Sequence, residues 1–243
     1  MSASGNLRGI IVALDGPAGS GKSTAARSLA EAEGYAYINT GAMYRAAAHL
    51  VEEGGIDAET NPAAAVKIAQ DMRFEYREEN GEPKYYVAPR DGAPLQDLTA
   101  VLFTAALTAK LKPVVNNETL RHLLVEKMRA AANEAIAHGA KGVVLEGRDI
   151  GTVVFPDAAV KFYVEADLEE RTRRRAEQLK QAGDTVEAEG LKKQLAKRDQ
   201  VDSSRAVGPL KKAADAIQID TTALDPQGVL DVLRKELARK LKK

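Results

Sequence analysis

The sequence of 243 residues contains no cysteine, no tryptophan and only three histidines. The absence of cysteine excludes a disulfide framework, a cysteine nucleophile and any site that holds zinc or an iron–sulfur cluster through thiolates. His49, His122 and His138 are too far apart in the sequence to form a paired zinc motif on one helix, so we do not expect a zinc enzyme.

Long hydrophobic runs and an excess of charge of one sign are also missing. No apolar run approaches the roughly 18 residues of a membrane span, and the N-terminal residues lack the apolar core of a secretory signal. The 35 Lys and Arg residues balance the 35 Asp and Glu residues, which argues against a protein that coats nucleic acid or an anionic membrane. We therefore expect a cytoplasmic protein without nucleic-acid or membrane partners.

Short apolar runs alternate with helical patterns along most of the chain. The predicted strands are Ile10–Leu14, Tyr35–Ile38, Gly142–Glu146, Lys161–Val164 and Gln218–Asp220. The predicted helices are Ser23–Glu33, Ala42–Glu53, residues 97–138 with a break near Pro113, Asp167–Lys180 and Gln227–Leu241. Asp167 and Glu170 have the spacing of a capping box at the start of the fourth helix. This alternation predicts an α/β fold, an open parallel sheet with helices on both faces.

Residues 54–94 differ in character from the rest of the chain. Asn80-Gly81 separates the alternating runs Arg73–Arg77 and Lys84–Val87, a pattern typical of a β-hairpin. We predict that residues 54–94 form a small antiparallel insert in a core that consists of residues 1–53 and 95–243.

The phosphate loop is the clearest motif in the sequence. The segment GPAGSGKST, residues 16–24, follows a predicted buried strand and opens a predicted helix, the context that the G-x-x-x-x-G-K-[ST] pattern requires. Its backbone N–H groups can surround phosphate oxygens, Lys22 can reach the β- and γ-phosphates, and the hydroxyl of Ser23 can bind Mg²⁺. The predicted ATP-binding residues are Gly16, Pro17, Ala18, Gly19, Ser20, Gly21, Lys22, Ser23 and Thr24. The motif leaves the reaction open, because GTPases, ATPases and small-molecule kinases share it.

Charged residues elsewhere could bind a second, anionic substrate. Arg148 and Asp149 follow a predicted strand at the carboxyl edge of the sheet, where ligands of open α/β sheets gather. Arg198, Asp202 and Arg205 are spaced so that a helix would place them on one face. Each alone is typical of a surface ion pair, but together with a phosphate loop they favour an acceptor pocket of a kinase.

Four segments in this order resemble bacterial-type cytidylate kinases: GPAGSGKST at 16–24, NTGAMYRA at 39–46, GRDIGTVVFPDA at 147–158 and RDQVDSSRAVGPLKKAADAIQID at 198–220. The resemblance implies a P-loop nucleoside monophosphate kinase with an acceptor-binding insert and a mobile helical lid at about residues 165–205. It implies transfer of a phosphoryl group from ATP to CMP or dCMP, in pyrimidine nucleotide metabolism, with Mg²⁺. We expect the protein to be a monomer.

The resemblance also implies roles for single residues. The implied CMP-binding residues are Thr40, Tyr44, Arg45, Thr108, Arg121, Arg148, Asp149, Arg198, Asp202 and Arg205, and the implied catalytic residues are Lys22, Arg148, Arg205 and Arg174. In this scheme Arg45, Arg148 and Arg205 hold the acceptor phosphate, because guanidinium forks match phosphate oxygens. Arg198 and Asp202 bind the sugar hydroxyls. Asp149 would accept a hydrogen bond from the amine of cytosine, and Arg121 would donate to its N3 and O2 atoms.

Arginines in the predicted lid have two interpretations. Arg171, Arg174 and Arg175 share one face of the predicted helix, which would be an ordinary solvated basic face or, in a kinase, a set of side chains that closes over ATP.

Two departures from the family pattern and two alternatives stay open. Asn39 stands where the family usually has Asp, and residues 107–121 form a longer segment than the family has there. The alternatives are a related kinase for UMP, AMP or a small metabolite, and a regulatory protein that binds a nucleotide without turning over an acceptor. The sequence has no Asn-Lys-x-Asp guanine motif, which weakens the second alternative.

Overall fold

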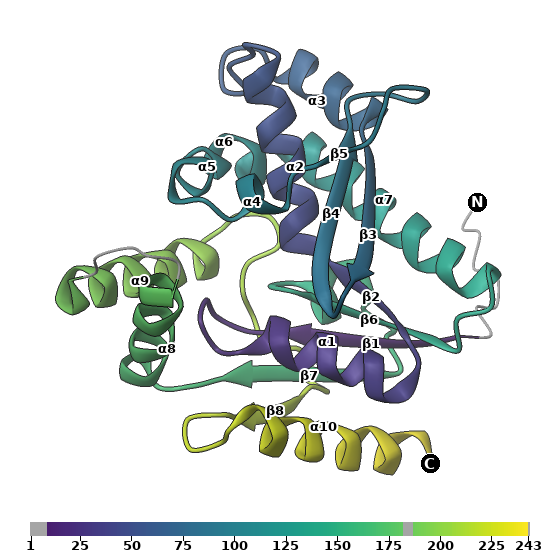
Figure 1. The fold of residues 1–243 in the computed structure, drawn as a ribbon, viewed down its shortest axis with the longest axis vertical. Helices are drawn as coiled ribbons and strands as arrows, with labels where there is room; N and C mark the ends of the chain where they lie inside the picture. The colour runs from purple at the N-terminus through teal and green to yellow at the C-terminus, as the bar shows by residue number, and fades with distance from the viewer. Residues whose placement is uncertain (1–8, 182–186, 243) are drawn as a thin grey trace. The chain divides into compact units, whose positions relative to one another are not determined.

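The chain is divided into two compact units in the computed structural model, which describes residues 9–181 and 187–242 (Figure 1). The first unit consists of Met1–Tyr37 and Ala132–Lys243, and the second consists of Ile38–Ala131. The second unit contains the segment 54–94 and extends beyond it on both sides. No helix in the described ranges is long and apolar enough to cross a membrane.

A parallel sheet forms the centre of the first unit. Its strands are β1 (Ile10–Asp15), β2 (Ala36–Asn39), β6 (Gly142–Gly147), β7 (Val160–Glu165) and β8 (Ile217–Asp220). The last two residues of β2 are counted in the second unit. They follow the order β2-β6-β1-β7-β8, and β1 pairs in parallel with both β6 and β7. Because its apolar side chains are buried on both faces, β1 is a continuous hydrophobic run, as the sequence pattern predicted.

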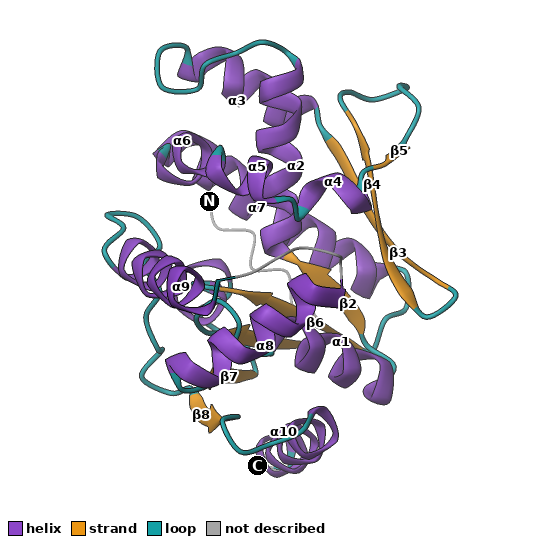
Figure 2. Cartoon of the chain, turned by 60° about the vertical axis from the view of Figure 1, so that its left-hand side comes forward, coloured by secondary structure: helices purple, strands orange, loops and turns teal. Residues whose placement is uncertain are grey.

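Helices pack on this sheet and confirm the predicted α/β fold (Figure 2). The helices of the first unit are α1 (Lys22–Glu33), α8 (Leu168–Gln181), α9 (Ala188–Ser203) and α10 (Pro226–Leu241), with a short π-helix, η1, at Ile150–Val154. α1 packs against β1 and β6, and α10 packs against α1. Gly34 ends α1 in the left-handed conformation at φ 66°, a common helix stop for glycine. α7 (Glu118–Ala137) has residues in both units.

The second unit combines helices with a small antiparallel sheet. Its elements are α2 (Thr40–Glu53), α3 (Pro62–Asp71), β3 (Arg73–Glu79), β4 (Glu82–Ala88), β5 (Gln96–Asp97), α4 (Thr99–Leu102), α5 (Ala105–Ala109) and α6 (Leu111–Asn116). β3 and β4 confirm the predicted hairpin. Asn80 and Gly81 both have positive φ, at 55° and 76°, as the favoured two-residue hairpin turn requires.

Three local predictions were wrong. The helical pattern over residues 97–138 breaks near Phe103, Lys110 and Asn117, not at Pro113. Pro113 lies in the first turn of α6, where its missing N–H has no helical partner to lose. Arg205 lies beyond the end of α9, so the helical face predicted for Arg198, Asp202 and Arg205 does not extend to it.

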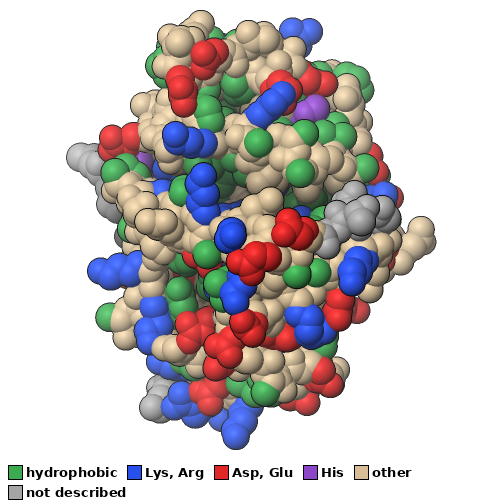
Figure 3. Space-filling model, turned by 90° about the vertical axis from the view of Figure 1, so that its left-hand side faces the viewer, with side chains coloured by type: hydrophobic (Ala, Val, Ile, Leu, Met, Phe, Trp, Pro, Cys, Tyr) green, Lys and Arg blue, Asp and Glu red, His purple; other side chains and the backbone are tan. Residues whose placement is uncertain are grey.

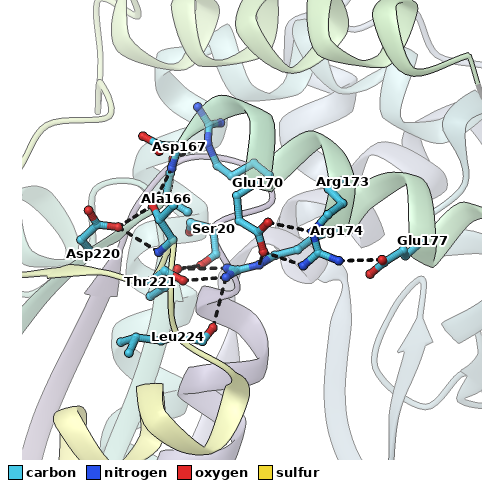
Figure 4. Close-up of polar contacts among 12 residues, drawn as sticks. Ser20, Ala166, Asp167, Glu170, Arg173, Arg174, Glu177, Asp220, Thr221 and Leu224 are labelled. Carbon is cyan, nitrogen blue, oxygen red and sulfur yellow. Dashed lines mark hydrogen bonds and ion pairs between the residues drawn. The ribbon is translucent and has the colours of Figure 1, made fainter.

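The third wrong prediction is the capping box at the start of α8. The backbone N–H of Asp167 donates to Oγ1 of Thr222 at 3.0 Å. The carboxylate of Glu170 instead accepts hydrogen bonds from Arg173 and Arg174 (Figure 4). These two guanidinium groups therefore bind the carboxylate that, in a capping box, would accept a hydrogen bond from the backbone N–H of Asp167.

Candidate active site

The phosphate loop joins β1 to α1 in the predicted arrangement of strand, loop and helix. A Cβ atom on Gly16 would lie 2.0 Å from the carbonyl oxygen of Val164, so no larger residue fits there. Gly19 and Gly21 have φ angles of 77° and 82°, a region that residues with side chains rarely adopt. The glycines therefore allow a tight backbone turn at the N-terminus of α1, where the N–H groups favour an anion.

Lys22 is a buried cation in this loop. Its Nζ atom donates to the carbonyl oxygen of Pro17 at 3.2 Å. Burial, together with the positive charge of Arg148, lowers its pKa to about 7, although Glu146 acts in the opposite direction. A polyphosphate near Lys22 would stabilise the charged form of this side chain. The site therefore favours the binding of a negatively charged group.

Glu146 is a candidate site residue that the sequence analysis missed. It lies near the end of β6, is buried, and accepts a hydrogen bond from Oγ of Ser23 at 2.8 Å. The signal was present, because an acidic residue near the carboxyl end of an apolar strand faces the edge where ligands gather. Ser23 and Glu146 supply hard oxygen donors, which fit Mg²⁺. The described part of the chain contains no cluster of three or more His, Cys, Asp or Glu residues that could hold a metal without the nucleotide.

Asp15, at the end of β1, positions the segment that follows β6. Its carboxylate accepts hydrogen bonds from the backbone N–H groups of Ile150 and Gly151, both at 2.8 Å. Burial raises the pKa of Asp15 to about 6, against the effect of these two N–H donors. The bonds fix the start of η1 directly after Arg148 and Asp149, which are among the residues predicted to contact the acceptor.

Three of the predicted arginines in the first unit surround one carboxylate. Nε of Arg148 donates to Oδ2 of Asp202 at 2.8 Å, and Nη2 of Arg205 donates to Oδ1 of the same group. Burial raises the pKa of Asp202, but Arg148 and Arg205 outweigh it, so the pKa is lower than usual. Burial and the charge of Arg148 lower the pKa of Arg198 to about 10. The cluster carries more positive than negative charge, which suits an anionic ligand.

Helix α2 carries the first predicted site residues of the second unit. Asn39 caps it, because Oδ1 accepts from the N–H of Ala42 at 2.9 Å and Nδ2 donates to the hydroxyl of Tyr85 at 3.1 Å. Nη1 of Arg45 donates to Oγ1 of Thr108 at 2.7 Å, although these residues are 63 positions apart. The guanidinium of Arg121 lies 5.4 Å from the centre of the Tyr44 ring, within the range of a cation–π contact.

The predicted acceptor residues belong to both units. Arg148, Asp149, Arg198, Asp202 and Arg205 are in the first unit, and Thr40, Tyr44, Arg45, Thr108 and Arg121 are in the second. Within each unit the structure brings predicted residues into contact: Arg148 with Asp202, and Arg45 with Thr108.

The arginines of α8 differ from one another in surroundings. Arg171 is buried, Arg174 is half-buried and hydrogen-bonded to Thr221 and Leu224, and Arg173 is exposed and paired with Glu170 and Glu177. On the face that carries α8 and α9, Lys and Arg side chains alternate with Asp and Glu (Figure 3). Of the two interpretations of these arginines, an ordinary solvated basic face does not describe the buried Arg171. The predicted lid also includes residues 182–186, which lie outside the described residues.

A cavity of about 480 Å³ adjoins the phosphate loop. Residues 19–25 form one wall, α8 forms a second, and residues 224–226 with Val229 form a third. The volume is within the range of small-molecule sites, so the rest of a nucleotide can be accommodated next to the loop.

Comparison with known proteins identifies the family. The model of the cytidylate kinase family matches residues 12–239. The cytidylate kinase of Geobacter sulfurreducens is 42% identical over 231 residues, which cover 95% of this chain and 93% of that protein. The cytidylate kinase of Anoxybacillus flavithermus is 41% identical over 222 residues, with 91% and 93% covered. An uncharacterized protein from Eubacterium ventriosum has a similar fold, with a TM-score of 0.50 at 15% identity over 95% of this chain and 98% of that one. The resemblance predicted from the sequence is confirmed, and the chain belongs to the cytidylate kinase family.

Proposed function

We infer that the protein transfers the γ-phosphoryl group of ATP to CMP or dCMP, giving ADP and CDP or dCDP. The observation that carries this inference is the match of residues 12–239 to the cytidylate kinase family, together with a phosphate loop in its full structural context. ATP places its phosphates on residues 16–24, and the adjoining cavity receives the rest of the nucleotide.

The chemical step is a displacement at the γ-phosphorus atom. An oxygen of the acceptor phosphate forms a bond to this phosphorus as the bond to the β-phosphate oxygen breaks, and ADP leaves with that electron pair. The acceptor phosphate is already an anion, so no strong base is needed, and catalysis consists of positioning and charge neutralisation. Lys22, Arg148 and Arg205 supply the positive charge. The hydroxyl of Ser23, held by Glu146, is the proposed ligand of Mg²⁺, which when bound neutralises the β- and γ-phosphates.

We propose that the acceptor is recognised by its phosphate, its sugar and its base. Arg45, Arg148 and Arg205 hold the acceptor phosphate, and the pair Arg198 and Asp202 binds the sugar hydroxyls. Thr40 and Tyr44 lie beside the nucleotide in this scheme, and residues 54–94 and 165–205 act as the acceptor insert and the lid. A monomeric state and a cytoplasmic location stay predictions from the sequence.

Thr108, Arg121 and Asp149 read the cytosine base. Asp149 is a pure acceptor when it is ionised, so it matches the exocyclic amine of cytosine and opposes the carbonyl that uracil has in its place. A mismatch leaves buried polar groups unpaired and costs about 1–3 kcal/mol, or about fivefold to 150-fold in selectivity.

A coupled assay of ADP release with Mg-ATP and CMP, dCMP, UMP, AMP or GMP tests the function. We expect turnover with CMP and dCMP, loss of turnover in Lys22→Ala, and reduced preference for CMP over UMP in Asp149→Asn. Asp157→Asn, at an exposed aspartate of the same segment, is the matched control and keeps the preference. ADP release that does not depend on any monophosphate would contradict the proposal.

A further inference from the structure

The carbonyl groups of the phosphate loop accept hydrogen bonds from donors within the loop and from donors outside it. A trans peptide group carries its C=O and N–H on opposite sides, so a donor that binds one carbonyl turns the next N–H the other way. The carbonyl of Pro17 accepts from Lys22 and Ser20, which belong to the loop itself. The carbonyls of Ala18 and Ser20 are held from outside the loop.

Arg171 on α8 holds the carbonyl of Ala18. Its Nη1 atom donates to this oxygen at 3.1 Å and to Oδ2 of Asp199 at 2.5 Å, and its Nε atom donates to the carbonyl of Ala166 at 2.9 Å. The residue is buried, and a Cβ atom on Gly19 would lie 3.3 Å from both Cβ and the carbonyl oxygen of Arg171. α8 thus packs directly on the loop, and the N–H of Gly19 points away from α8.

Arg174, one turn later, holds the carbonyl of Ser20 through Thr221. Nη1 and Nη2 of Arg174 donate to Oγ1 and to the carbonyl of Thr221, at 3.0 Å and 2.6 Å (Figure 4). Oγ1 of the buried Thr221 lies 3.1 Å from the carbonyl oxygens of both Ser20 and Glu165, and its one proton is shared between these two acceptors. Glu170 fixes the other side of the guanidinium by accepting from Nε at 2.7 Å. The carbonyl of Ser20 therefore faces Thr221, and the N–H of Gly21 faces the opposite way.

We propose that Arg171 and Arg174 are positioning residues of the ATP site, which turn the N–H groups of Gly19 and Gly21 toward the phosphates of the bound nucleotide. One turn of α8 orients two peptide groups of the loop, Arg171 directly and Arg174 through the hydroxyl of Thr221. Neither arginine touches phosphate in this role. The proposal rests on the proposed function in one respect, that the phosphates in the loop are those of ATP.

Thr221→Val is the sharpest test, because it removes one hydroxyl and keeps the shape of the side chain. We expect the dissociation constant for ATP, measured by titration calorimetry, to rise about tenfold, which equals about 1.4 kcal/mol. KM for ATP rises with it, while kcat and KM for CMP change little, and Thr221→Ser restores binding. Thr172→Val is the matched control, because among the described residues the hydroxyl of Thr172 bonds only the carbonyl of Leu168, within α8.

Arg171→Gln and Arg174→Gln extend the test, with the melting temperature measured in parallel. Both variants weaken ATP binding more than CMP binding in a protein that stays folded. Unchanged ATP affinity in Thr221→Val, or an equal loss of ATP and CMP binding, would overturn the proposal. A fall in kcat alone in Arg174→Gln would also overturn it and would favour direct contact with the transferring group. A wild-type protein that binds ATP but does not phosphorylate CMP would refute the proposed function and leave the comparison of ATP affinities valid.

Discussion

The low pKa of Lys22 predicts that ATP binding takes up a proton. The side chain is buried and lies in the field of Arg148 and Arg198, which hold its pKa at about 7 in the free protein. The phosphates of ATP stabilise the ammonium form and raise this pKa. The folded protein without nucleotide therefore loses the Lys22 charge as the pH rises through about 7, and the complex keeps it.

The size of the effect follows from the same pKa. At about pH 8 roughly nine-tenths of the Lys22 side chains are neutral in the free protein, so binding takes up about 0.9 proton per site. Above about pH 7 the affinity for ATP falls by up to about tenfold for each pH unit. Phosphate groups ionise near pH 6, so at about pH 8 ATP contributes little to the proton count.

Titration calorimetry in buffers with different ionisation enthalpies measures this uptake. Lys22→Arg is the control, because the guanidinium stays charged at every pH used and takes up no proton. Binding of ATP to the wild type without proton uptake at about pH 8, or the same uptake in Lys22→Arg, would refute the reasoning about Lys22.

Two further predictions concern stability, measured as urea unfolding. Asp202→Ala removes a buried carboxylate from the half-buried Arg148 and Arg205 and lowers the free energy of unfolding by about 3 kcal/mol. Asp71→Ala, which breaks an exposed pair, costs under about 1 kcal/mol. Because the pKa of Asp202 is lowered, its contribution to the free energy of unfolding is present above the ordinary pKa of 3.8 and is lost as the pH falls through the pKa of the folded state. Equal losses of unfolding free energy in Asp202→Ala and Asp71→Ala would contradict the expected difference between the two ion pairs. Asn39→Ala removes the cap of α2 and lowers the free energy of unfolding by about 1 kcal/mol. Asn39→Asp keeps an acceptor for the N–H of Ala42 and for the hydroxyl of Tyr85, so its stability stays close to that of the wild type. Wild-type stability in Asn39→Ala would show that the cap contributes nothing.

The phosphate loop and the hairpin could be predicted because local chemistry determines both. Gly16, Gly19 and Gly21 are needed by the backbone of the loop itself, and Asn80-Gly81 is needed by the turn. In both cases residues a few positions apart contain the whole signal.

The contact of Glu146 with Ser23 and the roles of Arg171 and Pro113 could not be predicted in the same way. Glu146 and Arg171 act through contacts with Ser23 and Ala18, more than 100 positions away, which only the packing of the sheet and α8 creates. Pro113 ends helices in general, but α6 begins just before it and tolerates it. Periodicity alone groups Arg171, Arg174 and Arg175, but their contacts differ: Arg171 is buried against Asp199, and the half-buried Arg174 and Arg175 bond Glu170 and Gln178.

Phosphorus NMR of a mixture of the protein, Mg²⁺, ATP and CMP tests the central claim most directly, because it identifies the product as well as the loss of substrate. The account predicts that ADP and CDP appear in equal amounts while ATP and CMP disappear together. ADP accompanied by inorganic phosphate, with CMP unchanged, would mean that water is the acceptor and would contradict it.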